Sequence, residues 1–271
     1  MAKLTSPRIQ AFRDDLLANL SRASAKKILT SLKMMLSDAQ RRGDVTQNVA
    51  LPVKIIKDKR TKRRPEIGVD IPTPDEIKDI IHAATGRVRP FLITAIFTGL
   101  RNSEPRGLRW DDLDLGRGEL RVRQRADWFN KIGAPKSEIP LGPFIVNALK
   151  EWRLACPKGE LGLVFPNNKG KPWDHSDIVV HHMWRVMVRA GVVDARGGPK
   201  YTGLHALRHF YASWCINSKK DGGLELPIKP VQQRLGHASI VMTSDVYGHL
   251  FPRTDDGKEL ADAEKALLSL R

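Results

Sequence analysis

Cysteine and long apolar segments are both scarce in this chain of 271 residues. Its two cysteines, Cys156 and Cys215, show no metal-ligand spacing, so we expect both thiols to be reduced and structural. No apolar run reaches the roughly 18 residues that a membrane-spanning helix needs, and the amino terminus carries no signal-peptide core. These absences argue against a membrane protein and favour a cytoplasmic location.

Acidic residues are few relative to basic ones. The chain has 46 lysines and arginines against 30 aspartates and glutamates, which gives a net charge of +16. Such a charge attracts polyanions, and the high linear charge density of nucleic acid makes it the leading partner. A merely soluble basic protein is the alternative that charge alone leaves open. The hydrophobic fraction of 41% is enough to fill a globular core.

The first part of the chain predicts two helices. Apolar residues share one side over residues 8–19, and they recur every three or four positions over residues 24–42, up to Gly43. Two such helices are too small for an independent core, so residues 1–56 are interpreted as part of a helical domain. The basic stretch that follows predicts a solvated linker over residues 57–70, either a passive tether or a segment that tracks a DNA backbone.

Residues 71–271 predict a mainly helical domain with one small antiparallel sheet, an α+β fold. Thr73 and Glu76 form a capping box around Pro74, and Gly99 ends an apolar helix over residues 90–98. Alternating apolar residues predict strands over residues 119–125 and 136–141. Further helices are expected over residues 143–155, 176–190, 204–217, 231–235 and 255–268.

Arginine and histidine residues occur at spacings that suit a phosphate group. His205 and Arg208 are three positions apart, so a helix places them on one face, where they can converge on one anion. Arg101 follows a helix that ends at a glycine, and Glu104 can orient its guanidinium group. His237 also follows a helix end. Each residue alone is explained as well by an ordinary surface or core position, but the combination favours a site for phosphoryl transfer.

Tyr247 is the strongest candidate for a nucleophile among the three tyrosines. Tyr211 lies on the same predicted helix as His205 and is expected in the core, whereas Tyr247 follows a polar run beyond both histidine-bearing segments. Lys136 stands at the start of the second predicted strand. It can donate a proton to a leaving oxygen, although a lysine at a hairpin tip is also commonly just solvated.

His205 and His209 have the four-residue spacing that zinc proteases use. Those enzymes place a glutamate beside the first histidine, but this chain has Ala206 there and the cation Arg208 between the two rings. A positive charge beside a dication is unfavourable, so we expect no metal. His209 is instead expected to form a structural hydrogen bond.

Taken together and in this order, these segments resemble the boxes of the tyrosine recombinase, or phage integrase, family. The matching segments are residues 98–104 (TGLRNSE), residues 204–209 (LHALRH), residues 235–240 (LGHASI) and residues 242–250. The resemblance covers roughly residues 22–260, with residues 22–52 similar to the end of a core-binding domain. It implies an active site that consists of Arg101, Lys136, His205, Arg208, His237 and Tyr247.

The resemblance implies a site-specific DNA recombinase or integrase of a phage or another mobile element. Tyr247 would attack the scissile phosphate to form a 3′-phosphotyrosine, while the two arginines and His237 hold the nonbridging oxygens. Lys136 would protonate the leaving oxygen, and His205 would assist the proton loss of the tyrosine. The phosphotyrosine conserves the bond energy, so the resemblance implies neither ATP nor a metal nor another cofactor.

The implied partners are double-stranded DNA with attachment or recombination sites, and accessory DNA-bending or directionality proteins. A homotetramer on DNA is implied as well, with residues 258–270 docked on a neighbouring copy, although the same stripe can pack in cis. The chain departs from the family by starting late in the core-binding domain and by Pro105, where an aliphatic residue is usual. Two alternatives therefore stay open, an inactive DNA-binding remnant of an integrase and a type IB topoisomerase.

Overall fold

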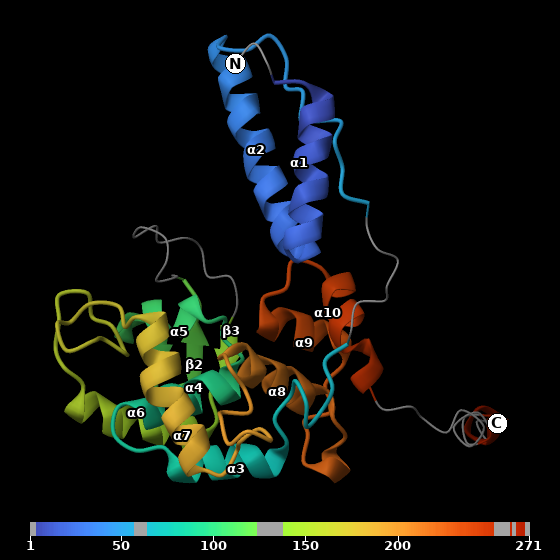
Figure 1. Cartoon of the computed structure of the whole chain (residues 1–271). Coiled ribbons are helices and arrows are strands. Elements are labelled where there is room, and N and C mark those ends of the chain that lie inside the picture. Colours follow the sequence, from blue (N-terminus) through green and yellow to red (C-terminus); the bar gives the residue numbers. More distant parts are fainter. Residues whose placement is uncertain (1–3, 57–63, 124–137, 252–260, 262–263, 269–271) are drawn as a thin grey trace. The chain divides into compact units, whose positions relative to one another are not determined.

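The computed structural model describes residues 4–56, 64–123, 138–251, 261 and 264–268 (Figure 1). Contacts within the chain divide it into two compact units, residues 1–62 and 63–271. Part of the predicted linker, residues 57–63, lies outside the described residues. Residues 66–71 form a hydrogen-bonded turn in the second unit.

The first unit contains helices α1 (Ser6–Asn19) and α2 (Arg22–Arg42), which confirms the two predicted helices. Ser21 caps α2 by accepting a hydrogen bond from the backbone of Ser24, and Gly43 ends it in the left-handed conformation. Asn48 donates to the Lys33 carbonyl and to Ser37 Oγ, both at 2.8 Å, so the segment after α2 is held along the helix. The buried cluster of this unit comprises Ile9, Leu29, Leu36, Ala50 and Val53.

The second unit is mainly helical with one small sheet, as the sequence predicts. Strand β2 (Glu119–Arg121) pairs antiparallel with β3 (Glu138–Pro140), and a short β1 (Leu113–Asp114), which was not predicted, pairs with the other side of β2. Leu120 stands opposite Ile139 in this register, and both side chains are buried. Within the described residues the strands are shorter than predicted.

Most predicted helices of the second unit are confirmed, with shifted ends. The segment over residues 176–190 is a π-helix, Asp177–Met183, that continues into α7 (Trp184–Arg189). Helix α10 (Ile240–Tyr247) was not predicted. Of the predicted helix over residues 255–268, the structure describes residues 261 and 264–268, which are helical. The helices are α3 (Pro74–Ala83), α4 (Val88–Thr98), α5 (Ser103–Gly107), α6 (Pro143–Ala155), α7 (Trp184–Arg189), α8 (His205–Ile216), α9 (Ile228–Leu235) and α10 (Ile240–Tyr247).

Two local sequence features shape the first part of this unit, the capping box of α3 and Pro105. Thr73 and Glu76 form the predicted capping box at the start of α3. Pro105 is the third residue of the five-residue helix α5, within its first turn, where a missing backbone N–H leaves no intrahelical bond unmade. Pro105 is therefore compatible with the turn that carries Arg101.

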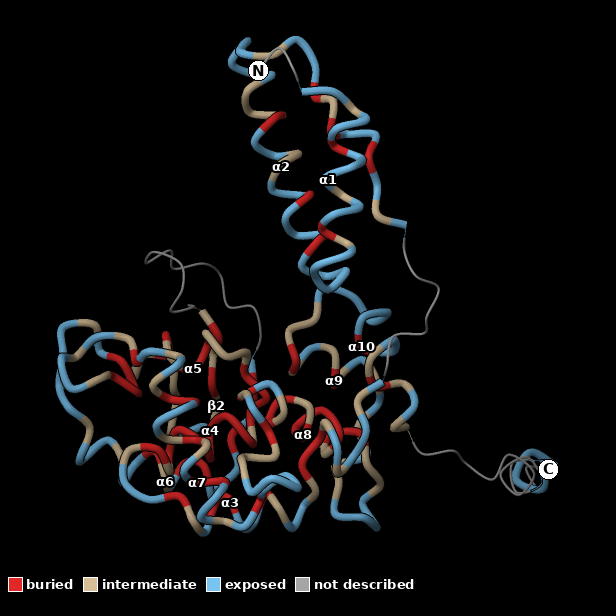
Figure 2. The backbone as a smooth tube through the Cα atoms, viewed as in Figure 1, coloured by how far each residue is buried: buried red, intermediate tan, exposed pale blue. Residues whose placement is uncertain are grey.

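Helix α4 lies at the centre of the second unit and packs against α8, α6 and α3. Nearly all of its side chains are buried, and Figure 2 shows the buried positions of α4 and α8 in the interior. Gly99 ends α4 with φ of 60°, and a Cβ atom there would lie 2.3 Å from Tyr211 Cδ1 on α8. The end of α4 thus touches α8 at a point where only glycine fits. Among the described residues, no helix has the length and apolar character to cross a membrane.

We expect Gly99→Ala to destabilise the protein more than the matched change Gly191→Ala. Both glycines have positive φ, of 60° and 72°, but no atom lies within 4 Å of a Cβ built on Gly191. Backbone strain alone costs roughly 1–2 kcal/mol, and the collision with Tyr211 adds about 1–3 kcal/mol of overpacking. Urea denaturation of the two variants checks this, and equal losses of unfolding free energy would contradict the packing described for Gly99.

Candidate active site

The structure brings five of the six predicted site residues together around the start of α8. His205 and Arg208 lie in the first turn of α8, and Arg101 lies in the turn between α4 and α5. His237 follows α9, and Tyr247 is the last residue of α10. Lys136, the sixth, falls in residues 124–137 and so lies outside the described residues.

Arg208 is held by main-chain carbonyls at the ends of two helices. Its NH1 group donates to Gly99 O and its NH2 group to Leu235 O, each at 2.5 Å, and its side chain is buried. Carbonyls at helix carboxyl ends carry partial negative charge, which suits a cation. Burial, with Arg101 nearby, lowers the pKa of Arg208 to about 10, so the group stays charged at neutral pH.

Arg101 is oriented by Glu104, as the sequence predicts. Glu104 accepts hydrogen bonds from the backbone N–H of Arg101 at 2.7 Å and from its NH1 group at 3.1 Å. The NH2 group of Arg101 donates to Gly236 O at 2.7 Å. Arg101 is about one-third exposed, whereas Glu104 is buried. The guanidinium groups of Arg101 and Arg208 are thereby held side by side, with Arg208 buried and Arg101 partly exposed. This arrangement can bind a phosphate.

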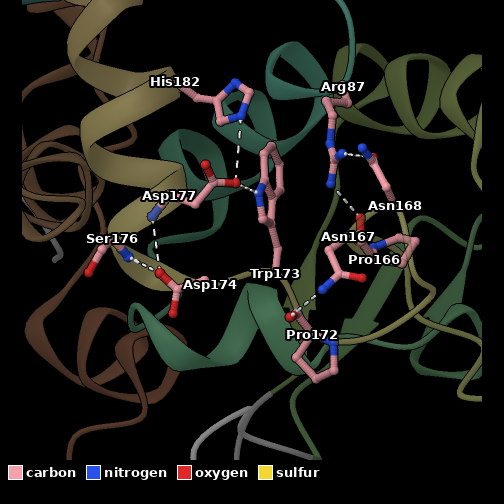
Figure 3. A network of polar contacts seen from close by, with 10 residues as sticks. All are labelled: Arg87, Pro166, Asn167, Asn168, Pro172, Trp173, Asp174, Ser176, Asp177 and His182. Carbon is pink, nitrogen blue, oxygen red and sulfur yellow. Dashed lines mark hydrogen bonds and ion pairs between the residues drawn. The ribbon is translucent and has the colours of Figure 1, made fainter.

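A second anchor holds the turn that carries Arg101, and no local sequence pattern predicts it. Asn102 Nδ2 lies 3.1 Å from His175 Nε2, and Arg106 Nε donates to Trp173 O at 2.6 Å. The Trp173 ring is itself fixed, as Figure 3 shows, because its Nε1 donates to Asp177 Oδ2 at 2.5 Å and the Arg87 guanidinium lies 3.9 Å from the ring centre. The chain over residues 173–177 is therefore a fixed support for the site.

Tyr247 lies between two histidines. Its hydroxyl group is 2.8 Å from His209 Nδ1, and its ring is stacked on His237 with an interplanar angle of 4° and 6.3 Å between ring centres. His237 Nδ1 lies 2.9 Å from Thr243 Oγ1, a buried hydroxyl on α10. The prediction that His209 forms a hydrogen bond is confirmed, and its partner is Tyr247 itself.

His205 lies next to His209 on α8, one helical turn before it. Its ring contacts the ring of His209 edge-on, with 4.5 Å between centres. The described hydrogen bond to the phenol belongs to His209, one helical turn further along α8. Sequence reasoning missed this link because it depends on how α10 meets α8, although the four-residue spacing of the two histidines did place both rings on one face.

The protein surroundings keep the histidines and Tyr247 of the site uncharged. Burial raises the pKa of Tyr247 to about 12, an effect that Arg208 partly opposes. Burial and the nearby positive groups lower the pKa of His209 to about 4, and likewise that of His237. The pKa of His205 is also lowered, by desolvation and then by the two arginines. At neutral pH the site therefore presents neutral imidazoles, a neutral phenol and two guanidinium cations.

The other tyrosines and the cysteines have structural surroundings, and Tyr211 and Cys215 share a buried cluster with Tyr247. Tyr201 hydrogen-bonds Glu76 at 2.8 Å, and Tyr211 packs in the core as predicted. Cys156 and Cys215 are free thiols. Within the parts of the chain that the structure describes, no group of three or more histidine, cysteine, aspartate or glutamate side chains could hold a metal ion.

A protein-family model described as the phage integrase family matches residues 72–253. The chain belongs to the tyrosine recombinase (phage integrase) family. Tyrosine recombinase XerC of Xylella fastidiosa strain M23 is 30% identical over 236 residues, which are 85% of this chain and 71% of that protein. A tyrosine recombinase XerC-like protein of Caldanaerobacter subterraneus is 26% identical over 86% of this chain, and the chain spans 64% of the length of that relative.

Solved structures share the fold of this tyrosine recombinase family member. The Tn1549 transposon integrase in complex with transposon right end DNA aligns with a TM-score of 0.66 and 19% identity, over 98% of this chain and 86% of that one. A lambda integrase dimer bound to a core site aligns with a TM-score of 0.62 and 22% identity, over 89% of this chain and 64% of that one.

We expect the stability of the protein to fall as the pH drops from about 6.5 to about 4, partly because of His237. Its pKa is about 4 in the folded protein against an ordinary value of 6.5, so in this window the unfolded chain binds a proton that the folded site does not. His237→Asn should remove on the order of 1–2 kcal/mol of this pH dependence. Thermal unfolding across this pH range makes the comparison, and identical pH profiles for His237→Asn and wild type would refute it.

Proposed function

We propose that the protein is a site-specific DNA recombinase that integrates or excises a phage or another mobile element through a covalent phosphotyrosine. The observation that carries this proposal is the contact of the Tyr247 phenol with histidines beside two arginines that backbone carbonyls hold in place. A phenol next to paired guanidinium groups has both parts that phosphoryl transfer needs, a nucleophile and fixed cations for the phosphate.

In the proposed reaction the Tyr247 oxygen attacks the scissile phosphorus. A bond forms between this oxygen and phosphorus, and the bond from phosphorus to the 5′ oxygen breaks, which leaves a 3′-phosphotyrosine. Arg101 and Arg208, with His237, hold the nonbridging oxygens and stabilise the charge of the transition state. The departing 5′ oxygen takes a proton from Lys136, a role that rests on the family resemblance. Rejoining with a partner strand reverses these steps.

The charge of the chain supports DNA as the substrate. The net charge of +16 suits a long polyanion, and relatives that carry DNA in their solved structures share the fold of this chain. The proposed activity requires access to chromosomal DNA, which is why we place the protein at the nucleoid in the cytoplasm. Directionality or DNA-bending proteins complete the proposed set of partners.

We expect Tyr247→Phe to abolish covalent attachment to a nicked suicide substrate while it leaves DNA affinity unchanged. The change deletes only the attacking oxygen, which the ring stack on His237 does not need. Tyr211→Phe is the matched control, because it removes the phenolic oxygen of another buried tyrosine in the same apolar cluster, and the adduct should persist.

Denaturing gel electrophoresis with labelled DNA detects the adduct. Its absence in the wild-type protein under all conditions would favour the alternative of an inactive DNA-binding remnant. Relaxation of plasmids that lack an attachment site would favour a type IB topoisomerase.

The proposed recombinase works as a homotetramer on DNA, with the carboxyl-terminal helix of one copy docked on the next. An apolar groove of about 420 Å³, whose lining includes Phe97, Phe144 and Trp214, offers a place for such a helix. Leu267 and Leu268 of the described terminal segment are 73% and 78% exposed, so their apolar side chains are available for burial. The groove and the leucines suit one another chemically, which supports docking in trans.

We expect removal of residues 256–271 to prevent tetramer formation on DNA, because the helix that docks on the neighbouring copy is lost. Replacement of Leu267 and Leu268 by glutamate should have the same effect with the full chain length kept. Leu154→Glu is the control, since Leu154 is an exposed leucine on α6, outside the groove lining. Native gel shifts and analytical ultracentrifugation report the assembly, and unchanged tetramers of the truncated protein would rule out docking in trans.

A further inference from the structure

We propose that Arg234, in the lining of the apolar groove, forms an ion pair with Glu264 of a second copy and thereby fixes the register and direction of the docked helix. The inference rests on the proposed function, because it requires the carboxyl-terminal helix of one copy to dock on the next. It adds the two residues that determine which helix the groove accepts and how that helix lies in it.

The groove is an apolar surface with fixed walls. Phe97 on α4 lies edge-on to Phe144 on α6, with 6.0 Å between ring centres, and edge-on to Trp214 on α8, with 5.6 Å. Trp214 is also held by a hydrogen bond of 2.9 Å from its Nε1 to Gly222 O. Phe144 is 50% exposed, although it is a large apolar side chain. The walls therefore present apolar surface that a docked helix can cover.

One cation interrupts this apolar lining. Of the described residues that line the groove, Arg234 on α9 carries a charge, and the others are apolar, aromatic, glycine or proline. Arg234 acts on Tyr211 and Cys215, because burial raises the pKa values of these two groups and the nearby guanidinium lowers them. Both groups are neutral at pH 7, so they do not compensate its charge.

The surroundings of Arg234 favour an acidic ligand. The ion pairs between residues in the described part of the chain do not include Arg234. A partly buried cation at the edge of an apolar surface is stabilised by a carboxylate that approaches together with apolar side chains. The groove therefore suits a helix that carries an acid on its apolar face.

The described end of the chain has such a face. Residues 264–268 are helical, and Glu264, Leu267 and Leu268 are all exposed. Positions three and four apart share one face of a helix, so Glu264 stands on the same face as the two leucines. This face has two apolar side chains and one acid, and the groove has apolar walls and one cation.

The charge and number of these segments favour a second copy as the occupant. Residues 255–271 contain five acidic and three basic residues, in a chain whose net charge is +16. A segment of this charge is repelled by a DNA backbone and attracted by a basic protein surface. Each copy offers one groove and one such segment, so a closed ring of copies can fill every groove.

An ion pair within an apolar contact determines how a docked helix lies. Leucines can remain in an apolar groove when a helix slides by about one turn of 5.4 Å. Such a shift, or a reversed helix, would separate Glu264 from Arg234 and leave both charges unpaired at the contact. Charge pairs at interfaces contribute specificity more than affinity. The groove therefore accepts one register and rejects leucine-rich helices that lack the acid.

Charge reversal tests the pair. Arg234→Glu brings two acids together at the contact, and Glu264→Arg brings two cations together. We expect each variant alone to weaken tetramer assembly on DNA by roughly tenfold or more. The double variant, in which the two charges are exchanged, should assemble as the wild-type protein does. Lys229→Glu is the matched control, because Lys229 is an exposed cation on α9 outside the groove lining, and assembly should persist.

A mixture of the two single variants shows whether the pair forms between copies. In an alternating tetramer, every contact joins an acid of one variant to a cation of the other. Equal amounts of Arg234→Glu and Glu264→Arg should therefore restore the assembly that neither variant shows alone. Native gel shifts and analytical ultracentrifugation measure it. Restoration in the double variant but not in the mixture would place the pair within one copy and overturn the proposal, and so would normal assembly of both single variants.

Neutral variants keep the test decisive if a charge reversal prevents folding, which circular dichroism detects. Arg234→Gln and Glu264→Gln should each weaken assembly, and their combination should weaken it no further, because the same pair is lost in all three. Additive losses would contradict the pair. A wild-type protein that forms no tetramer on DNA would instead refute the proposed assembly, whereas wild-type tetramers with unimpaired variants would overturn the pair alone.

Discussion

The site depends on keeping two guanidinium groups of like charge side by side inside a folded protein. Arg101 and Arg208 repel each other, and burial of Arg208 adds a desolvation cost. Carbonyls at three positions offset these costs, namely Gly99 O, Leu235 O and Gly236 O. These atoms are available because α4 and α9 end where they do, each at a glycine in the left-handed conformation.

The remaining groups are arranged around this pair of cations. Burial, and after it the nearby positive charge, keeps the neighbouring imidazoles neutral, and a neutral imidazole can accept a proton whereas an imidazolium cannot. Helix α10 then sets Tyr247 against two of these rings. The cations, the imidazoles and the nucleophile therefore belong to one arrangement, in which burial, with the two arginines, determines the protonation state of the imidazoles.

Local signals in the sequence were sufficient to predict most helices and the placement of Arg101 and Arg208 at helix ends and on α8. The capping box at Thr73, the stop at Gly99 and the three-residue spacing on α8 each depend on near neighbours, and each is confirmed. Helix α10 was missed because its first residues are apolar but exposed and a polar run follows, so no periodic stripe marks it. The bond between His209 and Tyr247 depends on how two distant helices meet, which periodicity does not encode. Lys136 lies outside the described residues and stays a prediction.

The acceptors of Arg208 are atoms of the main chain, and this has a consequence for how the protein can diverge. A carbonyl oxygen is present whichever side chain a position carries, so no single substitution at Leu235 deletes it. What must persist is the point at which each helix ends. A site built in this way is insensitive to the side chain at Leu235 but sensitive to Gly99 and Gly236, because each of these ends its helix with a positive φ.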